Sequence, residues 1–395
     1  MNFSLFRHSW AGLLAAGLLS AHADTIVPLG GSGAVTGQVT AIDAAGQVRA
    51  GDTALPLQQI WRIERGSVPA APTNAPAVVH LVDDSRLVAS AVTLDKDTCR
   101  VRWAAGADLA VPVTAVRAIR LAAPAPAGFA EAFQTPASQK DRLHVLVEGN
   151  PQTLEGALER MDAETLTFVW NNAPQKIARA KALGVVLAAL TAAPDRTGWA
   201  AVRLADGSVL WSPAPVLTNG VLSLKLAGQI ACAVPWEQVR QLDVRSDRLR
   251  FLSELDPVRV VEESLVAFAG SWRRDASVLG GPLRIGDQTF ERGLGTHARC
   301  RLTFAVPAGF THLAATIGID RATEGRGDCV FQVLGEDGRE LFGRRMKGTD
   351  APLPIRVAVA GVKQVTLAVE PGDDLDLGDH GDWGAARFEK DGGGK

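Results

Sequence analysis

The sequence predicts an all-β protein: tandem small β-barrel repeats followed by a β-sandwich. Three observations support this prediction. Short runs alternate apolar and polar residues, as half-buried strands do. A proline-containing signature recurs along the first 250 residues. The 40 Gly and 21 Pro imply frequent turns and few long helices. The 395 residues are enough for two or three domains and more than one hydrophobic core.

Composition narrows the function classes. The 41 Lys+Arg and 43 Asp+Glu give a net charge of −2, which argues against a nucleic-acid partner or a polybasic membrane-surface protein. Hydrophobic residues make up 47% and charged residues 21%, a globular composition rather than a disordered one. The chain has no Tyr, so an aromatic platform for a ligand needs Trp, Phe or His.

Residues 1–23 have the features of a signal peptide. Arg7 and His8 precede an apolar stretch over 11–19, and Ala21-His22-Ala23 fits a signal-peptidase site. We expect a mature chain from Asp24, secreted or periplasmic, and the alternative is an uncleaved N-terminal anchor. No later segment has 18 consecutive apolar residues, so no transmembrane segment is predicted.

Alternating strands fill the chain from Asp24 onward, for example at 37–43, 78–82 and 201–204. The signature Pro-x3-[Ile/Val]-x2-[Ile/Leu] occurs among them three times, and a degraded copy without Pro, containing one extra residue, places Leu183 and Val186 at its apolar positions. Its copies are Pro56 with Ile60 and Ile63, Pro112 with Val116 and Ile119, and Pro235 with Val239 and Leu242. The predicted repeats are 24–66, 77–121, 141–191 and 198–250.

Each repeat is expected to hold three or four strands, a one-turn helix beginning at the Pro, and a closing strand. This layout resembles the small SH3-like or Sm-like barrel. Pro/Ala-rich stretches at 67–76 and 122–127 are expected to act as spacers. Six tryptophans of this region are expected to pack rather than to bind ligands: Trp61, Trp103, Trp170, Trp199, Trp211 and Trp236.

A separate domain is predicted over 256–390, where the signature stops and strands lengthen between glycine-marked turns. Its length suits a single β-sandwich. A disordered tail is expected over 391–395. The domain carries, in order, the motifs Ser271-Trp272, 283–286, 290–298 with Gly-Leu-Gly-Thr-His-Ala, 317–320, 329–333, 336–338 and Asp379-His380-Gly381-Asp382-Trp383.

This series resembles the NPCBM family, carbohydrate-binding modules attached to glycoside hydrolases that include those of family 98. The resemblance implies a jelly-roll-like β-sandwich that binds glycans, with galactose-type sugars as the ligands of its best-known members. Family members often carry a second acid after the residue at Asp320, and here that position is Arg321.

A sugar offers hydroxyls and one apolar face, so its site needs polar side chains beside an aromatic plate. Trp383 with Asp379, His380 and Asp382 supplies this mixture. His297, in a glycine-rich loop, is expected to converge on it, and Trp272 is a second candidate plate. The alternative is that the same Trp, His and Asp side chains only pack, and that Asp320 only caps a turn.

Clustered acids at Asp373, Asp374 and Asp376 raise the question of calcium, which takes six to eight oxygen ligands. Ala385 stands where an EF-hand would need its last acid, so a solvated acidic turn is favoured and no cofactor is predicted. Four cysteines allow three disulfide pairings. A Cys300–Cys329 bridge is favoured because both lie in one domain, and the alternative is four buried thiols.

The chain lacks the motifs of serine hydrolases, zinc proteases, redox dithiols and P-loop enzymes. We therefore predict an exported, non-catalytic glycan-binding protein whose repeats are a scaffold. A second hypothesis is a cell-surface structural protein, with a protein partner on the repeats and no sugar site in the sandwich. A third is a glycoside hydrolase of unfamiliar type, which would need two carboxyl groups flanking a cleft.

Overall fold

The computed structural model describes residues 23–30, 33–66, 77–103, 105–121, 129, 133, 137, 139–188, 192–263, 271–373 and 378–391. Its named elements are β-strands and single-turn 3-10 helices, so the all-β prediction is confirmed. In these ranges no helix is long and apolar enough to span a membrane. The signal peptide (apart from Ala23), both predicted spacers and tail residues 392–395 lie outside them.

The region up to Val244 contains four consecutive units. Unit 1 holds β1 (Asp24–Pro28), β2 (Val35–Gly37), β3 (Val39–Ile42), β4 (Gln47–Ala50), β5 (Thr53–Pro56), η1 (Leu57–Gln59) and β6 (Ile60–Glu64). Unit 2 holds β7 (Ala77–Leu81), β8 (Arg86–Asp95), β9 (Thr98–Trp103), β10 (Leu109–Pro112), η2 (Val113–Ala115) and β11 (Val116–Arg120).

The other two units follow the same plan. Unit 3 holds β12 (Asp141–Val147), β13 (Asn150–Met161), β14 (Thr165–Trp170), β15 (Ala173–Ala178), η3 (Arg179–Lys181) and β16 (Ala182–Val186). Unit 4 holds β17 (Ala200–Leu204), β18 (Val209–Ser212), β19 (Val216–Thr218), β20 (Val221–Leu226), η4 (Ala227–Gln229), β21 (Ile230–Pro235), η5 (Trp236–Gln238) and β22 (Val239–Val244). In each unit the last strand pairs antiparallel with the first.

The helical turn predicted at the signature is present in all four units. Pro56, Pro112 and Pro235 are the N-caps of η1, η2 and η5, with φ between −61° and −56°. Ala178 takes this place in unit 3 with φ −65°. The extra residue predicted there is wrong, because counting from Ala178 puts the buried Ala182 and Val185 at the two apolar positions.

A β-bulge explains the odd spacing of those apolar positions. Residues three apart on a regular strand face opposite sides of the sheet. On β6 the register shifts so that Arg62 faces Val27 and Ile60 faces Pro28, which leaves Trp61 as an extra residue. Ile60 and Ile63 therefore both point into the core. The corresponding extra residues in the other units are Arg117, Leu183 and Arg240.

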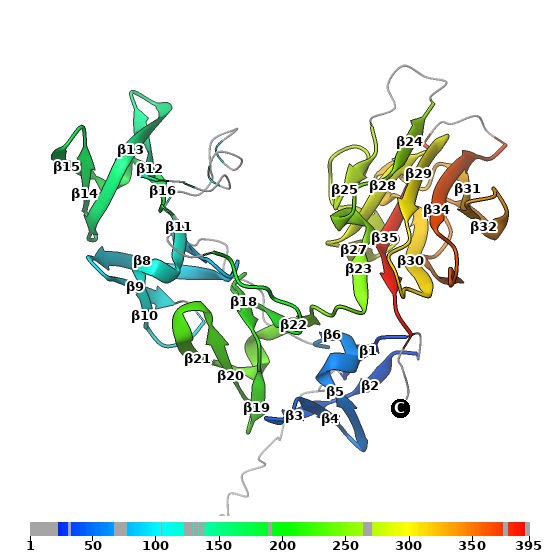
Figure 1. Ribbon diagram of the computed structural model, residues 1–395, viewed down its shortest axis with the longest axis horizontal. Helices are drawn as coiled ribbons and strands as arrows, with labels where there is room; N and C mark the ends of the chain where they lie inside the picture. Colours follow the sequence, from blue (N-terminus) through cyan, green and yellow to red (C-terminus); the bar gives the residue numbers. More distant parts are fainter. Residues whose placement is uncertain are drawn as a thin grey trace, which may run out of the picture.

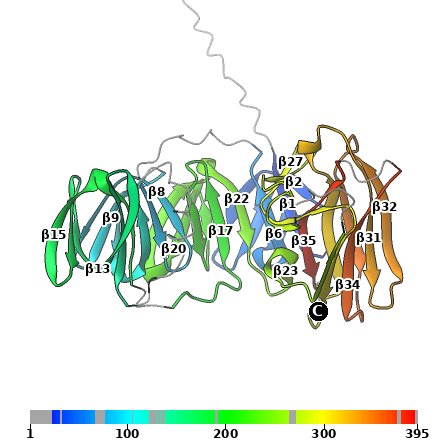
Figure 2. The same cartoon turned by 90° about the horizontal axis from the view of Figure 1, so that it is seen from above.

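The units share one continuous sheet instead of standing apart. The closing strands pair across units, β11 with β16 and β6 with β22. Unit 2 thus adjoins unit 3, and unit 1 adjoins unit 4, while β8 meets β18 between the pairs. One hydrophobic core runs through all four units, from Ile26 to Val244. Figure 2 shows the units in one row that ends at the C-terminal domain.

The C-terminal domain is a two-sheet sandwich with its own core. Its first elements are β23 (Leu249–Phe251), η6 (Leu252–Glu254), β24 (Arg259–Glu262), β25 (Arg273–Arg274), β26 (Leu283–Ile285), β27 (Gln288–Phe290), β28 (Gly293–His297) and β29 (Cys300–Ala305). The remainder are β30 (His312–Ile319), η7 (Arg321–Thr323), β31 (Asp328–Gly335), β32 (Glu340–Lys347), β33 (Leu353–Ala358), β34 (Gln364–Pro371) and β35 (His380–Glu389).

One sheet has the order β25-β28-β35-β30-β33, with β23 beside β35, and the other has the order β24-β29-β34-β31-β32. Because β23 pairs with β35, the sandwich begins before residue 256. The four units and the sandwich form two arms of an open V that meet at unit 1 (Figure 1). Trp61 of unit 1 packs against Phe251 there, with ring centroids 6.3 Å apart.

Candidate functional site: the polar end of the sandwich

Three of the predicted site residues, Trp272, His297 and His380, gather at one end of the sandwich, which we call the polar end. Antiparallel pairing brings the last residue of β28, His297, opposite the first residue of β35, His380. The ends of β24 and β30 lie at the same level, since Glu262 faces Cys300 and Ile319 faces Gly381. The opposite end of β35 pairs with β23 and adjoins unit 1, so the polar end points away from the repeats (Figure 1).

Glu262 connects three segments at this end. One carboxylate oxygen accepts a hydrogen bond from the Trp272 backbone N–H at 2.7 Å, and the other accepts one from the Ser271 hydroxyl at 2.7 Å. The oxygen that accepts from Trp272 also lies 3.3 Å from Nε2 of His297. A half-buried tryptophan, a carboxylate and an imidazole therefore meet at the end of β24. The guanidinium of Arg274 lies 5.3 Å from the Trp272 ring.

The two histidines differ in their surroundings. Nδ1 of His297 lies 2.7 Å from the carbonyl oxygen of Ala298, so the proton on Nδ1 fixes the ring and leaves Nε2 aimed at Glu262. His380 is half-buried, and its Nδ1 has no hydrogen-bond partner among the described residues. Burial lowers the pKa of His380, and the nearby His297 and Arg326 lower it further against the opposing effect of Asp320. His380 is thus held neutral, able to donate or accept one hydrogen bond.

Asp379 has a structural contact. Its Oδ1 accepts a hydrogen bond from the Asp328 backbone N–H at 2.7 Å, and its carbonyl accepts one from the Ala298 N–H at 2.9 Å. The Asp379 side chain is fully buried. It therefore ties the starts of β31 and β35 together beneath the polar end and is not exposed to a solute.

Asp382 and Asp320 form a buried acidic pair. Asp382 is 0% exposed, and this burial, with the Asp320 carboxylate nearby, raises the pKa of Asp382 well above its ordinary range. Asp320 accepts the Ala322 N–H at 2.7 Å and is the N-cap of η7, as the packing alternative predicted. Arg321, next in the chain, pairs with Asp287 at 2.9 Å.

The role predicted for Trp383 as a sugar-facing plate is wrong in this structure. The Trp383 side chain is 0% exposed and packs edge-on against Phe331, with centroids 5.1 Å apart and an interplanar angle of 71°. It belongs to the core between the sheets. On β35 its neighbour His380 is three residues away and faces the polar end, so one motif supplies both a core residue and a site residue.

The predicted Cys300–Cys329 disulfide is also wrong, since Cys300 carries a free thiol. Both β29 and β31 pair with β34, and Cys300 is level with Val369 whereas Cys329 is level with Pro371. Two strand spacings of about 4.8 Å each put the two Cα atoms beyond the reach of a disulfide. Burial raises the pKa of the Cys300 thiol to about 12.

Of the three acidic residues considered as calcium ligands, only Asp373 lies in the described part of the chain. Its carboxylate pairs with Arg345, which also binds Asp328. Asp374 and Asp376 lie outside the described residues. Across the parts of the chain that are described, no three His, Cys, Asp or Glu side chains are grouped as metal ligands would be.

Glu262 is the site residue that the sequence did not reveal. It lies outside the motifs, in a strand that could be aligned with the rest only through its pairing to β29. A single exposed glutamate at a strand end has no sequence signature. Trp272, His297 and His380 were predicted, and the structure brings all three to the polar end.

The C-terminal part of the chain is thus a β-sandwich domain, with polar side chains and a tryptophan at one end. Residues 250–389 match the family model of the NPCBM/NEW2 domain, and this part of the chain is an NPCBM/NEW2 domain. A protein of Renibacterium salmoninarum named as an endo-alpha-N-acetylgalactosaminidase is 36% identical over 110 residues. The match covers 28% of this chain and 7% of that relative, so the chain spans a small part of its length.

Solved structures of CBM51 modules are also similar. A CBM51 module of Clostridium perfringens in complex with methyl-galactose is 23% identical, with a TM-score of 0.32 over 35% of this chain and 99% of that one. The tandem CBM51 modules of a family 98 glycoside hydrolase from Streptococcus pneumoniae are 12% identical, with a TM-score of 0.32 over 68% and 92%.

Proposed function

We propose that this protein binds glycans at the polar end of its C-terminal sandwich, through Glu262, Trp272 and His380, with the buried His297 positioning Glu262 from below. The observation that carries the proposal is the position of Glu262, whose carboxylate joins the backbone of Trp272 to the imidazole of His297. Membership of residues 250–389 in the NPCBM/NEW2 family supports glycan binding as the function of this domain.

The chemistry of these residues suits a sugar. Glu262 accepts hydrogen bonds from hydroxyl groups, and the neutral His380 donates or accepts one. The half-buried indole of Trp272 packs partly against the sandwich core and lies near the Arg274 guanidinium, and its remaining surface is apolar. A galactose-type sugar, with its apolar face and convergent hydroxyls, is the ligand class that we infer.

We further infer an exported protein that binds without catalysis. A glycosidase needs two carboxyl groups available on either side of the scissile bond. At the polar end Asp382 is fully buried with its pKa raised well above the ordinary range by that burial, and Asp320 is engaged as a helix cap. Among the three carboxylates of Asp320, Asp382 and Glu262, that of Glu262 is the one at the surface, with 24% of its side chain exposed.

The experiment is a binding screen of the full chain against immobilised glycans, followed by titration of each glycan that binds. Trp272→Ala and Glu262→Gln are each expected to weaken binding about tenfold or more. The first variant removes the aromatic surface offered to the sugar, and the second removes the charge from a hydrogen bond to a sugar hydroxyl. Binding that is equally strong in both variants would contradict the proposal.

Matched controls separate lost contacts from misfolding. Trp170→Ala removes an exposed tryptophan of unit 3, and Glu336→Gln removes an exposed glutamate elsewhere on the sandwich. Both controls should bind as the unaltered chain does. Unchanged thermal unfolding of the Glu262→Gln variant would show that its loss of binding is local.

A further inference from the structure

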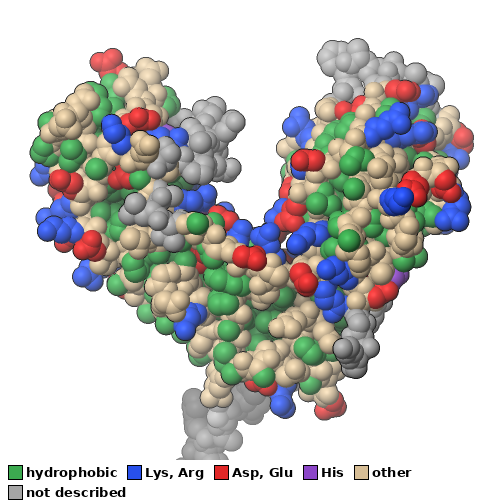
Figure 3. Space-filling view, viewed as in Figure 1, with side chains coloured by type: hydrophobic (Ala, Val, Ile, Leu, Met, Phe, Trp, Pro, Cys, Tyr) green, Lys and Arg blue, Asp and Glu red, His purple; other side chains and the backbone are tan. Residues whose placement is uncertain are grey.

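A cavity lies where the two arms meet, far from the polar end. Its volume is about 310 Å³, near the lower end of the range for small-ligand sites. Unit 1, unit 4 and the sandwich all contribute to its walls. Basic and acidic side chains gather on the floor of the notch between the arms (Figure 3). The cavity therefore exists only in the assembled chain.

Aromatic rings and arginines line this cavity together. Trp61, Trp211 and Phe251 are half-buried in its walls. Arg196 lies over the Trp211 ring, with its guanidinium 4.5 Å from the centroid. The N-terminal tryptophans were expected to pack; Trp61 does pack against Phe251, and both Trp61 and Trp211 also line this cavity. Aromatic surface beside polar groups is what the apolar face of a sugar ring requires.

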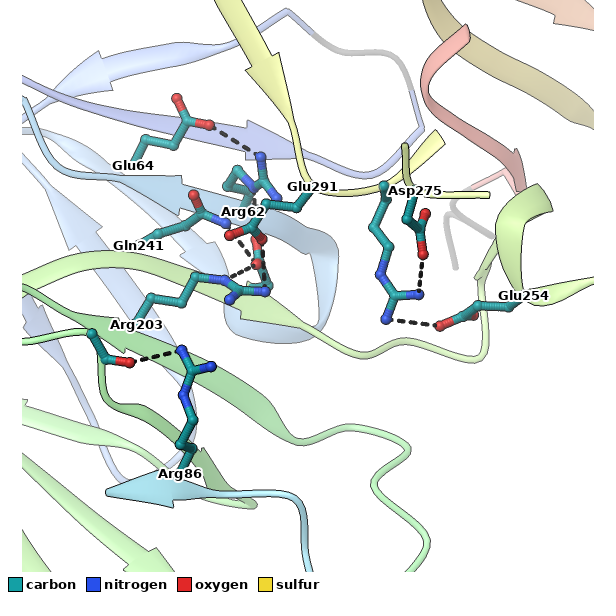
Figure 4. Close-up of polar contacts among 11 residues, drawn as sticks. Arg62, Glu64, Arg86, Arg203, Gln241, Glu254, Asp275 and Glu291 are labelled. Carbon is teal, nitrogen blue, oxygen red and sulfur yellow. Dashed lines mark hydrogen bonds and ion pairs between the residues drawn. The ribbon is translucent and has the colours of Figure 1, made fainter. Parts of the chain in front are cut away.

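Most of the charges in the walls are already compensated. Asp243 accepts hydrogen bonds from Nε of Arg62 at 2.6 Å and Nε of Arg203 at 3.4 Å. Arg203 also pairs with Glu291 of the sandwich at 2.7 Å (Figure 4). Arg292 pairs with Glu254 at 3.5 Å. Arg196 pairs with Asp84 at 2.8 Å.

Arg245 and Arg250 are the exceptions. Both line the cavity, and no ion pair joins either of them to another described residue. Their field helps to lower the pKa of Asp195, after the hydrogen bonds from Thr197, but Asp195 is exposed and lies outside the cavity wall. Six arginines against four carboxylates line the cavity, so it carries an excess of positive charge.

We propose that this cavity binds an acidic sugar residue, whose carboxylate pairs with Arg245 and Arg250 while its ring lies against Trp211. Arginine is suited to planar, bidentate recognition of carboxylates. The cavity volume accommodates a single monosaccharide residue. This site is independent of the glycan site proposed at the polar end.

The test titrates the full chain with galacturonate and with galactose, which differ only in the carboxylate at C6. The double variant Arg245→Gln/Arg250→Gln is expected to bind galacturonate about tenfold more weakly or worse, because two charge-assisted hydrogen bonds are lost. Arg339→Gln/Arg344→Gln removes two exposed arginines of the sandwich and should leave galacturonate binding unchanged. Equal galacturonate affinity in the Arg245/Arg250 double variant would overturn the proposal.

Two further measurements make the result specific. Trp211→Ala should also weaken galacturonate binding, and displacement of galacturonate by equimolar inorganic sulfate would overturn the role of the sugar ring. Glu262→Gln is expected to leave galacturonate binding at the cavity intact. Loss of galacturonate binding in Glu262→Gln, with no effect in the Arg245/Arg250 double variant, would place the acidic sugar at the polar end and overturn the cavity proposal alone.

Discussion

The guanidinium of Arg387 lies 4.1 Å from the ring centroid of Trp61, joining the last strand of the sandwich to the closing strand of unit 1. Trp61 is the bulged residue of β6, so the same local irregularity that sets the repeat spacing also turns an aromatic ring toward the second domain. Arg62 covers the ring as well, at 4.8 Å. Nε of Arg387 is held by Glu389 at 2.9 Å.

This contact predicts how the two arms are held. Trp61→Ala removes the ring that Phe251 and Arg387 contact, and we expect the arms to move apart because a cation–π contact contributes about 0.5–2 kcal/mol. Small-angle X-ray scattering should show a larger maximum dimension for this variant. Trp170→Ala, at an exposed position far from the contact, is the control, and identical scattering from all three proteins would contradict the prediction.

Trp383 is predicted to stabilise the sandwich. Trp383→Ala empties a fully buried site against Phe331 and should cost about 3–5 kcal/mol, measured by urea unfolding of the full chain. Trp383→Phe should recover part of this loss. The two cores can unfold in separate transitions, and the loss should appear in that of the sandwich. If the Trp383→Ala variant kept its stability and lost only glycan binding, the prediction would be contradicted, and Trp383 would belong to the binding site.

Asp382 is predicted to make the sandwich less stable as pH rises. Its folded pKa is raised above the ordinary value of 3.8, so the carboxyl stays protonated in the fold while the unfolded chain ionises. Its contribution is fully present below pH 3.8 and is lost as pH rises toward the folded pKa. Asp382→Asn does not ionise, so its melting temperature relative to the unaltered chain should increase from pH 4 to pH 8. A difference that is constant with pH would contradict this account.

His80 and His144 predict acid sensitivity between units 2 and 3. Their rings lie 5.5 Å and 6.5 Å from that of Phe133. Burial, and then Arg117, lowers the pKa of His80 from 6.5 to about 3, and burial lowers that of His144. Folding stability from His80 is therefore complete above pH 6.5 and lost as pH falls toward 3, by about 1 kcal/mol per pH unit.

The measurement is the urea midpoint between pH 7 and pH 4.5. His80→Gln should flatten the decline at low pH even if it lowers stability at pH 7. His312→Gln, a half-buried histidine of the sandwich, is the matched control and should keep the original slope. Equal slopes for all three proteins would show that His80 does not carry the acid sensitivity.

Local signals in the sequence were sufficient for the strands and the helical turns. Proline fixes φ wherever it stands, so η1, η2 and η5 could be placed from Pro56, Pro112 and Pro235. The pairing of unit 1 with unit 4 could not be predicted, because it depends on strand edges far apart in the chain. The bulge was equally hidden, since it arises from register against a partner strand.

The candidate site was also predictable only in part. The motifs allowed His297 and His380 to be predicted as neighbours, and they are neighbours because the end of β28 pairs with the start of β35 in an antiparallel sheet. The motif does not reveal which of its side chains are buried. Trp383 and His380, three residues apart, were therefore both predicted to contact the sugar, although Trp383 lies in the core. Glu262 was missed because its partners Trp272 and His297 are distant in sequence.

The central claim is that a glycan occupies the polar end. Its most direct test is to follow the indole N–H resonances of the full chain by NMR during titration with a glycan that binds in the screen. The Trp272 resonance, assigned with the Trp272→Phe variant, should shift saturably, while that of the buried Trp383 stays in place. Saturable binding that moves other indole signals and leaves Trp272 unchanged would contradict the claim.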